Sequence, residues 1–131
     1  MVKIIIAGSR EFDNYDFLKS NMDVLFSLFG INKNAPIEII CGMCRGADTL
    51  GERFAKENDY AIKYFPADWD KYGKAAGVIR NEEMAKYAAE HDNEDEDMGI
   101  LVAIWDGKSR GTKNMIENAE KYGLVQYTVK F

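Results

Sequence analysis

The sequence lacks the marks of several large classes of protein. None of its apolar runs reaches the length of a membrane-spanning helix. The N-terminal apolar run is short and leads directly into Arg10 and Glu11, so we expect no signal peptide and a cytoplasmic protein. The 131 residues carry a formal net charge of −5, which disfavours indiscriminate binding to nucleic acids and anionic membranes.

Cysteine and histidine are scarce. The two cysteines, Cys41 and Cys44, form a C-G-M-C motif that is either a redox pair or two small residues packed in a strand-to-helix turn. We favour packing, because the tryptophan and proline that usually flank a redox pair are missing, as is a second Cys/His pair for zinc. His91 lies in an acidic run, residues 90–97, whose spacing fits no calcium loop. We interpret this run as a solvated loop and expect no metal and no cofactor.

A dinucleotide-binding fingerprint is absent as well. The first apolar run, residues 2–7, ends at Gly8, and Ser9 and Arg10 follow where G-x-G-x-x-G is expected. No acidic residue that could bind a ribose ends the second apolar run. These two absences exclude a dehydrogenase of the usual nucleotide-binding kind.

What the chain does contain is an alternation of strand-like and helix-like patterns. Continuous apolar runs are typical of strands covered on both faces of a parallel sheet, and apolar residues spaced by three and four indicate helices. The order predicts a single α/β domain over residues 1–131, a Rossmann-like, doubly wound sandwich with a mostly parallel five-stranded sheet. The predicted strands are 2–7, 37–41, 61–65, 99–105 and 125–129, and the predicted helices are 14–29, 47–57, 79–89 and 112–122.

The loops that follow the first four strands each contain a glycine and a cation. In an open parallel sheet these loops meet at the carboxyl edge, where ligands bind. Glycine lets backbone N–H groups approach a phosphate, and arginine offers a bidentate fork to it. We therefore predict an anion-binding pocket with these ligand-binding residues: Gly8, Ser9, Arg10, Gly42, Arg45, Gly46, Asp48, Trp69, Arg80, Asn81, Gly107, Ser109, Gly111 and Thr112.

Some of these residues have an alternative structural role. We expect the hydroxyl and backbone N–H of Ser9 to bind phosphate and Arg10 to supply counter-charge, unless Arg10 pairs with Asp48. Asp48 either binds ribose hydroxyls, orients an arginine or caps a helix. Trp69 and Tyr72 either stack on a base or pack their loop against the sheet.

Two further expectations concern the cations and the main phosphate turn. We expect the turn from Gly107 to Thr112 to hold phosphate through its backbone. Arg80 is the strongest candidate for a ligand-contacting cation. We place it at the start of a helix, on a surface loop, where it contributes little to stability.

The motifs GSREF, GxxRGADTL, FPADWDKYGKAAGVIRNEEM and GxxxGT resemble the YspA-like branch of the SLOG superfamily, which includes Smf/DprA and LONELY GUY relatives. The resemblance extends over nearly the whole chain. It implies a Rossmannoid domain that binds nucleotides or nucleotide-derived ligands. Some relatives hydrolyse the bond between base and ribose phosphate, and DprA-type relatives bind single-stranded DNA. In the hydrolases a glutamate follows the P-G-G-x-G-T turn, whereas here Lys113, Asn114 and Met115 follow it.

Three functions are consistent with these features. The first is binding of a small nucleotide or an ADP-ribose-like molecule. The second is hydrolysis of the N-glycosidic bond of nucleoside monophosphates, with Asp48, Glu82, Glu83 and Asp106 as candidate carboxylates. The third, single-stranded DNA binding, is disfavoured by the net charge. We expect a small-molecule partner, no nucleic acid and no membrane, and leave a homo-oligomer open.

Overall fold

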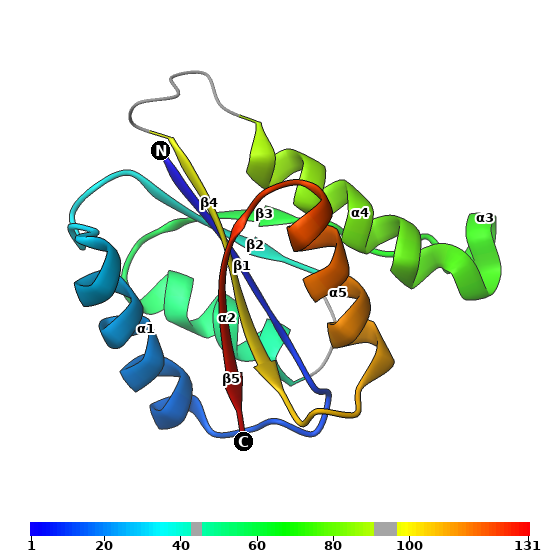
Figure 1. Ribbon diagram of the computed structural model, residues 1–131, viewed down its shortest axis with the longest axis horizontal. Helices are drawn as coiled ribbons and strands as arrows, with labels where there is room; N and C mark the ends of the chain where they lie inside the picture. Colours follow the sequence, from blue (N-terminus) through cyan, green and yellow to red (C-terminus); the bar gives the residue numbers. More distant parts are fainter. Residues whose placement is uncertain (43–45, 91–96) are drawn as a thin grey trace.

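The five strands of the computed structural model form one parallel sheet in the order β3-β2-β1-β4-β5 (Figure 1). The structure describes residues 1–42, 46–90 and 97–131. The strands are β1 (Val2–Gly8), β2 (Ile37–Cys41), β3 (Ala61–Tyr64), β4 (Met98–Trp105) and β5 (Val125–Lys130). The helices are α1 (Tyr15–Phe29), α2 (Ala47–Glu57), α3 (Trp69–Tyr72), α4 (Ala76–Ala89) and α5 (Arg110–Lys121), with a 3₁₀ turn, η1 (Gly73–Ala75). The predicted α/β, Rossmann-like class is confirmed.

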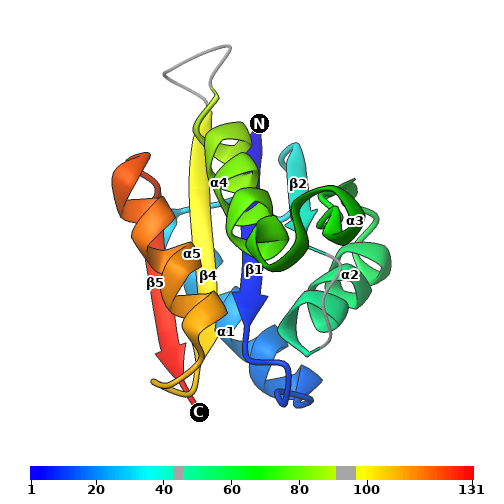
Figure 2. The ribbon, with the colours of Figure 1, turned by 90° about the vertical axis from the view of Figure 1, so that its right-hand side faces the viewer.

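Helices cover both faces of the sheet. Helices α1 and α2 pack on one face, and α4 and α5 pack on the other (Figure 2). Each face of the sheet has its own hydrophobic core, and successive residues of β1 pack alternately into the two cores. Ile4 and Ile6 belong to the core under α1 and α2, whereas Ile5 and Ala7 belong to the core under α4 and α5. Because both faces are buried, the central strands read as continuous apolar runs rather than alternating ones.

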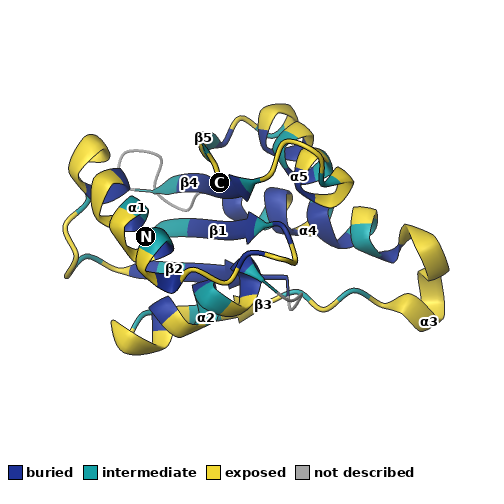
Figure 3. Ribbon diagram, turned by 90° about the horizontal axis from the view of Figure 1, so that it is seen from below, coloured by how far each residue is buried: buried dark blue, intermediate teal, exposed yellow. Residues whose placement is uncertain are grey.

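The two edge strands are covered less completely than the three central ones. Lys63 and Tyr64 of β3 are exposed, and β5 alternates between half-buried and exposed residues (Figure 3). An edge strand has a neighbour on one side only, so the helices that cover the centre of the sheet reach it incompletely. The alternation in β5 is thus the pattern of a half-covered strand.

Local signals determine where the long helices begin and end. The Asn14 side chain accepts a hydrogen bond from the Phe17 N–H at the start of α1. At its end Gly30 adopts a left-handed conformation (φ +62°) that lets its N–H reach the last carbonyls. Because Asn14 is the cap and not the first helical residue, α1 begins one residue later than predicted, whereas its end at Phe29 is as predicted.

The segment between β3 and α4 differs from the predicted loop. It forms α3 and η1, and α4 begins at Ala76, earlier than the predicted start at residue 79. The Asp68 side chain accepts a hydrogen bond from the Lys71 N–H and so caps α3, which projects beyond the sheet (Figures 1 and 3). No residue of α3 is buried, so this helix leaves no apolar periodicity in the sequence.

The topology creates one switch point, between β1 and β4. These strands pair from Val2 opposite Met98 to Gly8 opposite Ile104. After β1 the chain turns towards α1 on one face, and after β4 it turns towards α5 on the other. Open α/β sheets bind ligands in the crevice at this point. Within the described ranges, no helix is long and apolar enough to cross a membrane.

Candidate functional site

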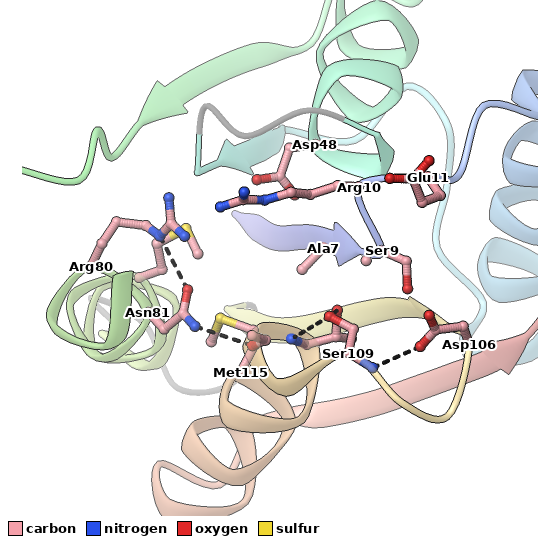
Figure 4. A pocket seen from close by; sticks show the side chains of 14 residues that line it. Ala7, Ser9, Arg10, Glu11, Asp48, Arg80, Asn81, Asp106, Ser109 and Met115 are labelled. Carbon is pink, nitrogen blue, oxygen red and sulfur yellow. Dashed lines mark hydrogen bonds between the residues drawn. The ribbon is translucent and has the colours of Figure 1, made fainter. Parts of the chain in front are cut away.

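A pocket of about 350 Å³ lies at this switch point (Figure 4). Its volume is within the range of about 300–1,000 Å³ that is usual for small-molecule sites. The lining comes from the end of β1 and the loop after it, from α2 and α4, and from the β4–α5 connection and α5 itself. The lining residues are Ala7, Gly8, Ser9, Arg10, Glu11, Asp48, Arg80, Asn81, Met84, Asp106, Ser109, Gly111, Thr112 and Met115.

Most of the predicted ligand-binding residues lie in this lining. Four of them, Gly42, Gly46, Trp69 and Gly107, lie outside it, and Arg45 lies outside the described residues. The lining also contains residues that the sequence analysis did not assign to ligand binding: Ala7, Glu11, Met84, Asp106 and Met115. Asp106 was named only as a candidate carboxylate for hydrolysis. Alternation along β1 could have identified Ala7, but nothing local predicts that Glu11, Met84 and Met115 meet here.

Two of the glycines are required for close packing of the chain. A Cβ at Gly8 would collide with the Ile104 carbonyl oxygen and lie 2.8 Å from the Ala47 Cβ. A Cβ at Gly46 would collide with the Ser9 carbonyl oxygen, and Gly46 itself has φ +78°, a conformation that favours glycine. Both glycines bring the β1 loop, β4 and α2 together and so form the wall of the pocket.

Ser9 is the most deeply buried polar residue of the lining, with 3% of its surface exposed. Its backbone N–H donates to the Ile104 carbonyl (3.1 Å), so the prediction that this N–H binds phosphate is wrong. Its hydroxyl makes no hydrogen bond to any described residue. The hydroxyl faces Asp106 (Figure 4), close enough to help keep the pKa of that carboxyl low. This side chain therefore retains its capacity to bond a ligand.

The turn after β4 is already occupied by a carboxylate of the chain itself. Asp106 Oδ1 accepts hydrogen bonds from the N–H groups of Lys108 and Ser109, both at 2.8 Å. These backbone bonds hold the pKa of the Asp106 carboxyl below its usual value. The expectation of a phosphate turn from Gly107 to Thr112 is therefore wrong for Lys108 and Ser109, because Asp106 already takes their N–H groups.

The start of α5 still offers free donors. The Ser109 hydroxyl caps the helix by accepting from the Thr112 N–H (3.5 Å) and the Thr112 hydroxyl (3.2 Å). The N–H groups of Arg110 and Gly111, in the first turn, have no carbonyl four residues earlier in the helix. Together with the positive end of the helix dipole they make this first turn the anion-binding part of the lining.

Arg80 occupies a different environment from the one predicted. It lies inside α4, not on a surface loop, and only 9% of its surface is exposed. Its Nη1 donates to the Gly42 carbonyl, and its Nε donates to Asn81 Oδ1 (3.1 Å). The Asn81 amide in turn donates to Asn114 Oδ1 (2.9 Å) and the Gly111 carbonyl (3.3 Å). Arg80 thus joins α4 to the end of β2 while it lines the pocket, and the expectation of a surface cation is corrected.

Asp48 is buried close to this arginine. A Cβ added at Gly42 would lie 2.9 Å from Asp48 Oδ2 and 3.1 Å from Arg80 Nη1, so both groups border the same small space. This placement agrees with the predicted role of orienting an arginine. The alternative ion pair between Arg10 and Asp48 is not found in the described part of the chain, although both side chains line the pocket (Figure 4). The exposed Arg10 guanidinium is therefore available to an anion.

The aromatic and acidic candidates outside the lining have other positions. Trp69 is 53% exposed, and a Cβ added at Gly77 would lie 3.7 Å from its ring and 4.0 Å from Arg80 Nη2. The Trp69 ring therefore lies on the outer side of Arg80, which forms part of the pocket wall. Glu82 pairs with Lys86 (3.4 Å) and Lys121 (3.5 Å), away from the pocket.

Neither cysteine nor histidine contributes to the described site. Cys41 is a buried free cysteine in the α1/α2 core, and burial raises the pKa of its thiol to about 12. Its environment agrees with packing, whereas Cys44 and His91 lie outside the described residues. Across residues 1–42, 46–90 and 97–131 no group of three metal-ligating side chains is found.

Comparison with known proteins assigns the chain to a family. No solved structure shows significant similarity to it. It is similar to the Gene 61 protein of Mycobacterium phage D29, with 28% identity in an alignment 131 positions long. The alignment covers 95% of this chain and 93% of that protein. The family model YAcAr, described as the YspA, cpYpsA-related SLOG family, matches residues 2–72, more than half of the chain. The chain therefore belongs to the YspA, cpYpsA-related SLOG family.

Proposed function

We propose that the switch-point pocket binds a small nucleotide or a nucleotide-derived molecule such as ADP-ribose. The observation that carries this proposal is the arrangement of the exposed Arg10 guanidinium and the first turn of α5 around one pocket, at the edge of the sheet where parallel α/β folds bind ligands. Membership of the SLOG family supports a nucleotide-related ligand in general terms.

The charges of the lining limit how much phosphate the pocket accepts. Two cations, Arg10 and Arg80, face three carboxylates, Glu11, Asp48 and Asp106. A triphosphate would bring more negative charge than these cations neutralise, whereas a single phosphate needs only the first turn of α5 and Arg10. We therefore expect monophosphates, or ligands with singly charged phosphate groups, to bind better than triphosphates.

The lining also offers an apolar surface. Ala7, Met84 and Met115 come from β1, α4 and α5 and lie among the polar groups of the pocket. Methionine side chains adapt their shape to flat rings and make favourable contacts with aromatic groups. This surface suits a base or the carbon face of a sugar, and Trp69 offers a second stacking surface for the outer part of a longer ligand.

Binding is tested by thermal shift and isothermal titration calorimetry with nucleoside mono-, di- and triphosphates, cyclic nucleotides and ADP-ribose. A ligand at 100 times its Kd should stabilise the protein by about 2.7 kcal/mol. Arg10→Ala should weaken binding at least about tenfold, since a charge-assisted hydrogen bond contributes about 1.5–3 kcal/mol. Lys19→Ala, which removes an exposed cation of α1, is the matched control and should have no effect. Absence of stabilisation by every ligand at millimolar concentration would refute the proposal.

A hydrolase is the second candidate, because two of the four proposed carboxylates line the pocket. Asp48 and Asp106 are both present, and the lowered pKa of Asp106 keeps it ionised at neutral pH. An ionised carboxylate next to a ribose would stabilise the positive charge that develops as an N-glycosidic bond breaks. Chromatography of nucleoside monophosphates incubated with the protein would detect free base. No base after long incubation at high protein concentration would exclude this activity.

Single-stranded DNA binding has weaker support. Lys71 and Lys74 lie on the exposed segment with Trp69, but Asp68 and Asp70 balance their charge, and Arg80 is buried. A DNA-binding surface needs a continuous basic groove with stacking aromatic residues. Oligonucleotide binding that falls steeply with salt would favour this function over the first two.

A further inference from the structure

The corner of the pocket formed by Ser9 and Asp106 has bonding capacity that the fold does not use. The Ser9 hydroxyl oxygen is fully buried and has no hydrogen-bond partner among the described residues. Buried polar side chains in native proteins are nearly always satisfied, so an exception at the wall of a pocket points to a group that enters the pocket. Ser9 lines the pocket, and its hydroxyl points towards Asp106 at one end of it (Figure 4).

Asp106 contributes the second half of this corner. Both backbone donors of its turn, the N–H groups of Lys108 and Ser109, bond to Oδ1. No hydrogen bond to the other oxygen, Oδ2, is found in the part of the chain that the structure describes, and in Figure 4 this oxygen is on the side of Ser9. The two backbone bonds fix the carboxylate in place and keep it ionised, so that Oδ2 is an oriented, charged acceptor.

We propose that Ser9 and Asp106 bind the cis-diol of a ribose, and that the pocket thereby selects ribonucleotides over 2′-deoxyribonucleotides. This inference rests on the proposed function. One hydroxyl of the sugar donates to Asp106 Oδ2, and its neighbour accepts a hydrogen bond from the Ser9 hydroxyl. An acceptor next to a hydroxyl that can donate is complementary to two adjacent sugar hydroxyls, each of which can do both.

The position of the corner agrees with the rest of a nucleotide. Ser109 donates its N–H to Asp106 and at the same time caps α5. The diol corner and the first turn of α5 are therefore neighbours, as the ribose and the 5′-phosphate are in a nucleotide. A phosphate is disfavoured at the corner itself because Asp106 would repel it, so the two subsites impose one direction on the ligand.

The test compares matched ligand pairs by isothermal titration calorimetry. The probes are the four common ribonucleoside 5′-monophosphates, the corresponding 2′-deoxy compounds, and ribose 5-phosphate against 2-deoxyribose 5-phosphate. The wild-type protein should prefer the ribo form at least about tenfold, the effect of one hydrogen bond to a charged acceptor. The sugar phosphates show whether the preference depends on the diol alone or needs a base.

Two variants assign the preference to this corner. Ser9→Ala and Asp106→Asn should each reduce the ribo/deoxy ratio several-fold. The affinity for the deoxy compound should change little in Ser9→Ala and should rise in Asp106→Asn, because that substitution removes a negative charge near the phosphate. The asparagine side chain introduced by Asp106→Asn would retain an oxygen for the two backbone N–H groups, so the turn should persist. Ser20→Ala, which removes an exposed hydroxyl of α1, is the matched control and should leave the ratio unchanged. Ser9→Ala should also be no less stable than the wild type without ligand, because the hydroxyl makes no bond to the described residues of the fold.

The outcomes separate the two proposals. If ribo and deoxy compounds bind equally well, the diol site is refuted and the nucleotide pocket stands. If the wild-type protein prefers the ribo compounds but both variants keep this preference, another part of the pocket distinguishes ribose from deoxyribose. The assignment of the preference to Ser9 and Asp106 is then refuted. If neither set of compounds binds, the proposed function fails and this inference fails with it. A strong loss of stability in Ser9→Ala would show that its hydroxyl serves the fold instead.

Discussion

Replacing Arg80 with alanine is expected to lower the free energy of unfolding by about 2–4 kcal/mol. The charged hydrogen bond to the buried Gly42 carbonyl contributes about 1.5–3 kcal/mol, and its loss leaves that carbonyl without this donor. Loss of the buried aliphatic stem and of the bond to Asn81 adds to the cost. In a chain of this size, 1 kcal/mol corresponds to about 3–5 °C, so the midpoint of thermal unfolding should fall by about 6–20 °C.

Urea unfolding followed by circular dichroism measures this effect. Arg10→Ala is the matched control, because Arg10 also lines the pocket but is exposed. This substitution should change the free energy of unfolding by no more than about 0.5 kcal/mol. Arg80→Lys should recover part of the loss, since lysine can reach the Gly42 carbonyl but lacks the fork that also bonds Asn81. If Arg80→Ala is as stable as Arg10→Ala, the argument that Arg80 joins α4 to β2 is refuted.

Three further predictions concern the packing at Gly8, the ionisation of Tyr87 and the burial of Cys41. Gly8→Ala should destabilise the protein by about 2 kcal/mol or more in urea unfolding, because the added Cβ would collide with the neighbouring strand β4. Gly111→Ala is the control: the space around Gly111 is open, so this substitution should be neutral or slightly stabilising. Equal effects of the two substitutions would contradict the close packing at Gly8. Burial and a hydrogen bond to a carboxylate raise the pKa of Tyr87 from 10.0 to about 12, so its contribution to stability is complete below pH 10 and is lost as the pH rises to about 12. Tyr87→Phe should therefore make the alkaline decline in unfolding free energy shallower, and an unchanged slope would count against the raised pKa. In a Cys44→Ser variant, Cys41 should resist iodoacetamide at about pH 8 in the native protein and react after unfolding, whereas rapid native labelling would contradict its burial.

The sequence predicted the elements whose signals are local. The bounds of α2 (Ala47–Glu57) and β2 (Ile37–Cys41) were predicted to the residue, and those of α1 differ only at residue 14. Apolar periodicity and capping depend on residues within a few positions of one another, so one sequence suffices to recognise them. Helix α3 was missed for the same reason, because an exposed helix of four residues has no buried face to mark it.

The candidate site was predicted in outline and corrected in its chemistry. The carboxyl edge of a parallel sheet is where ligands bind in any doubly wound fold, so the convergence of the loops follows from the strand order. The strand order does not determine which polar groups at this edge remain free to bind a ligand. Ser9 and Arg80 were both assigned to a phosphate, yet the N–H of Ser9 bonds Ile104 and Arg80 bonds the Gly42 carbonyl, 38 positions earlier in the chain.

By itself, the sequence determined the fold class, the alternation of strands and helices, and the edge of the sheet at which a ligand would bind, because these depend on local apolar patterns and on the rules of parallel-sheet topology. Only the tertiary structure decided that Arg80 is buried, that Asp106 occupies its own turn, and that the Ser9 hydroxyl is left without a partner among the described residues. The physical reason is that hydrogen-bond donors and acceptors are assigned by distances between residues far apart in the chain. Those distances exist only after β1, β2, β4 and the helices around them have packed together.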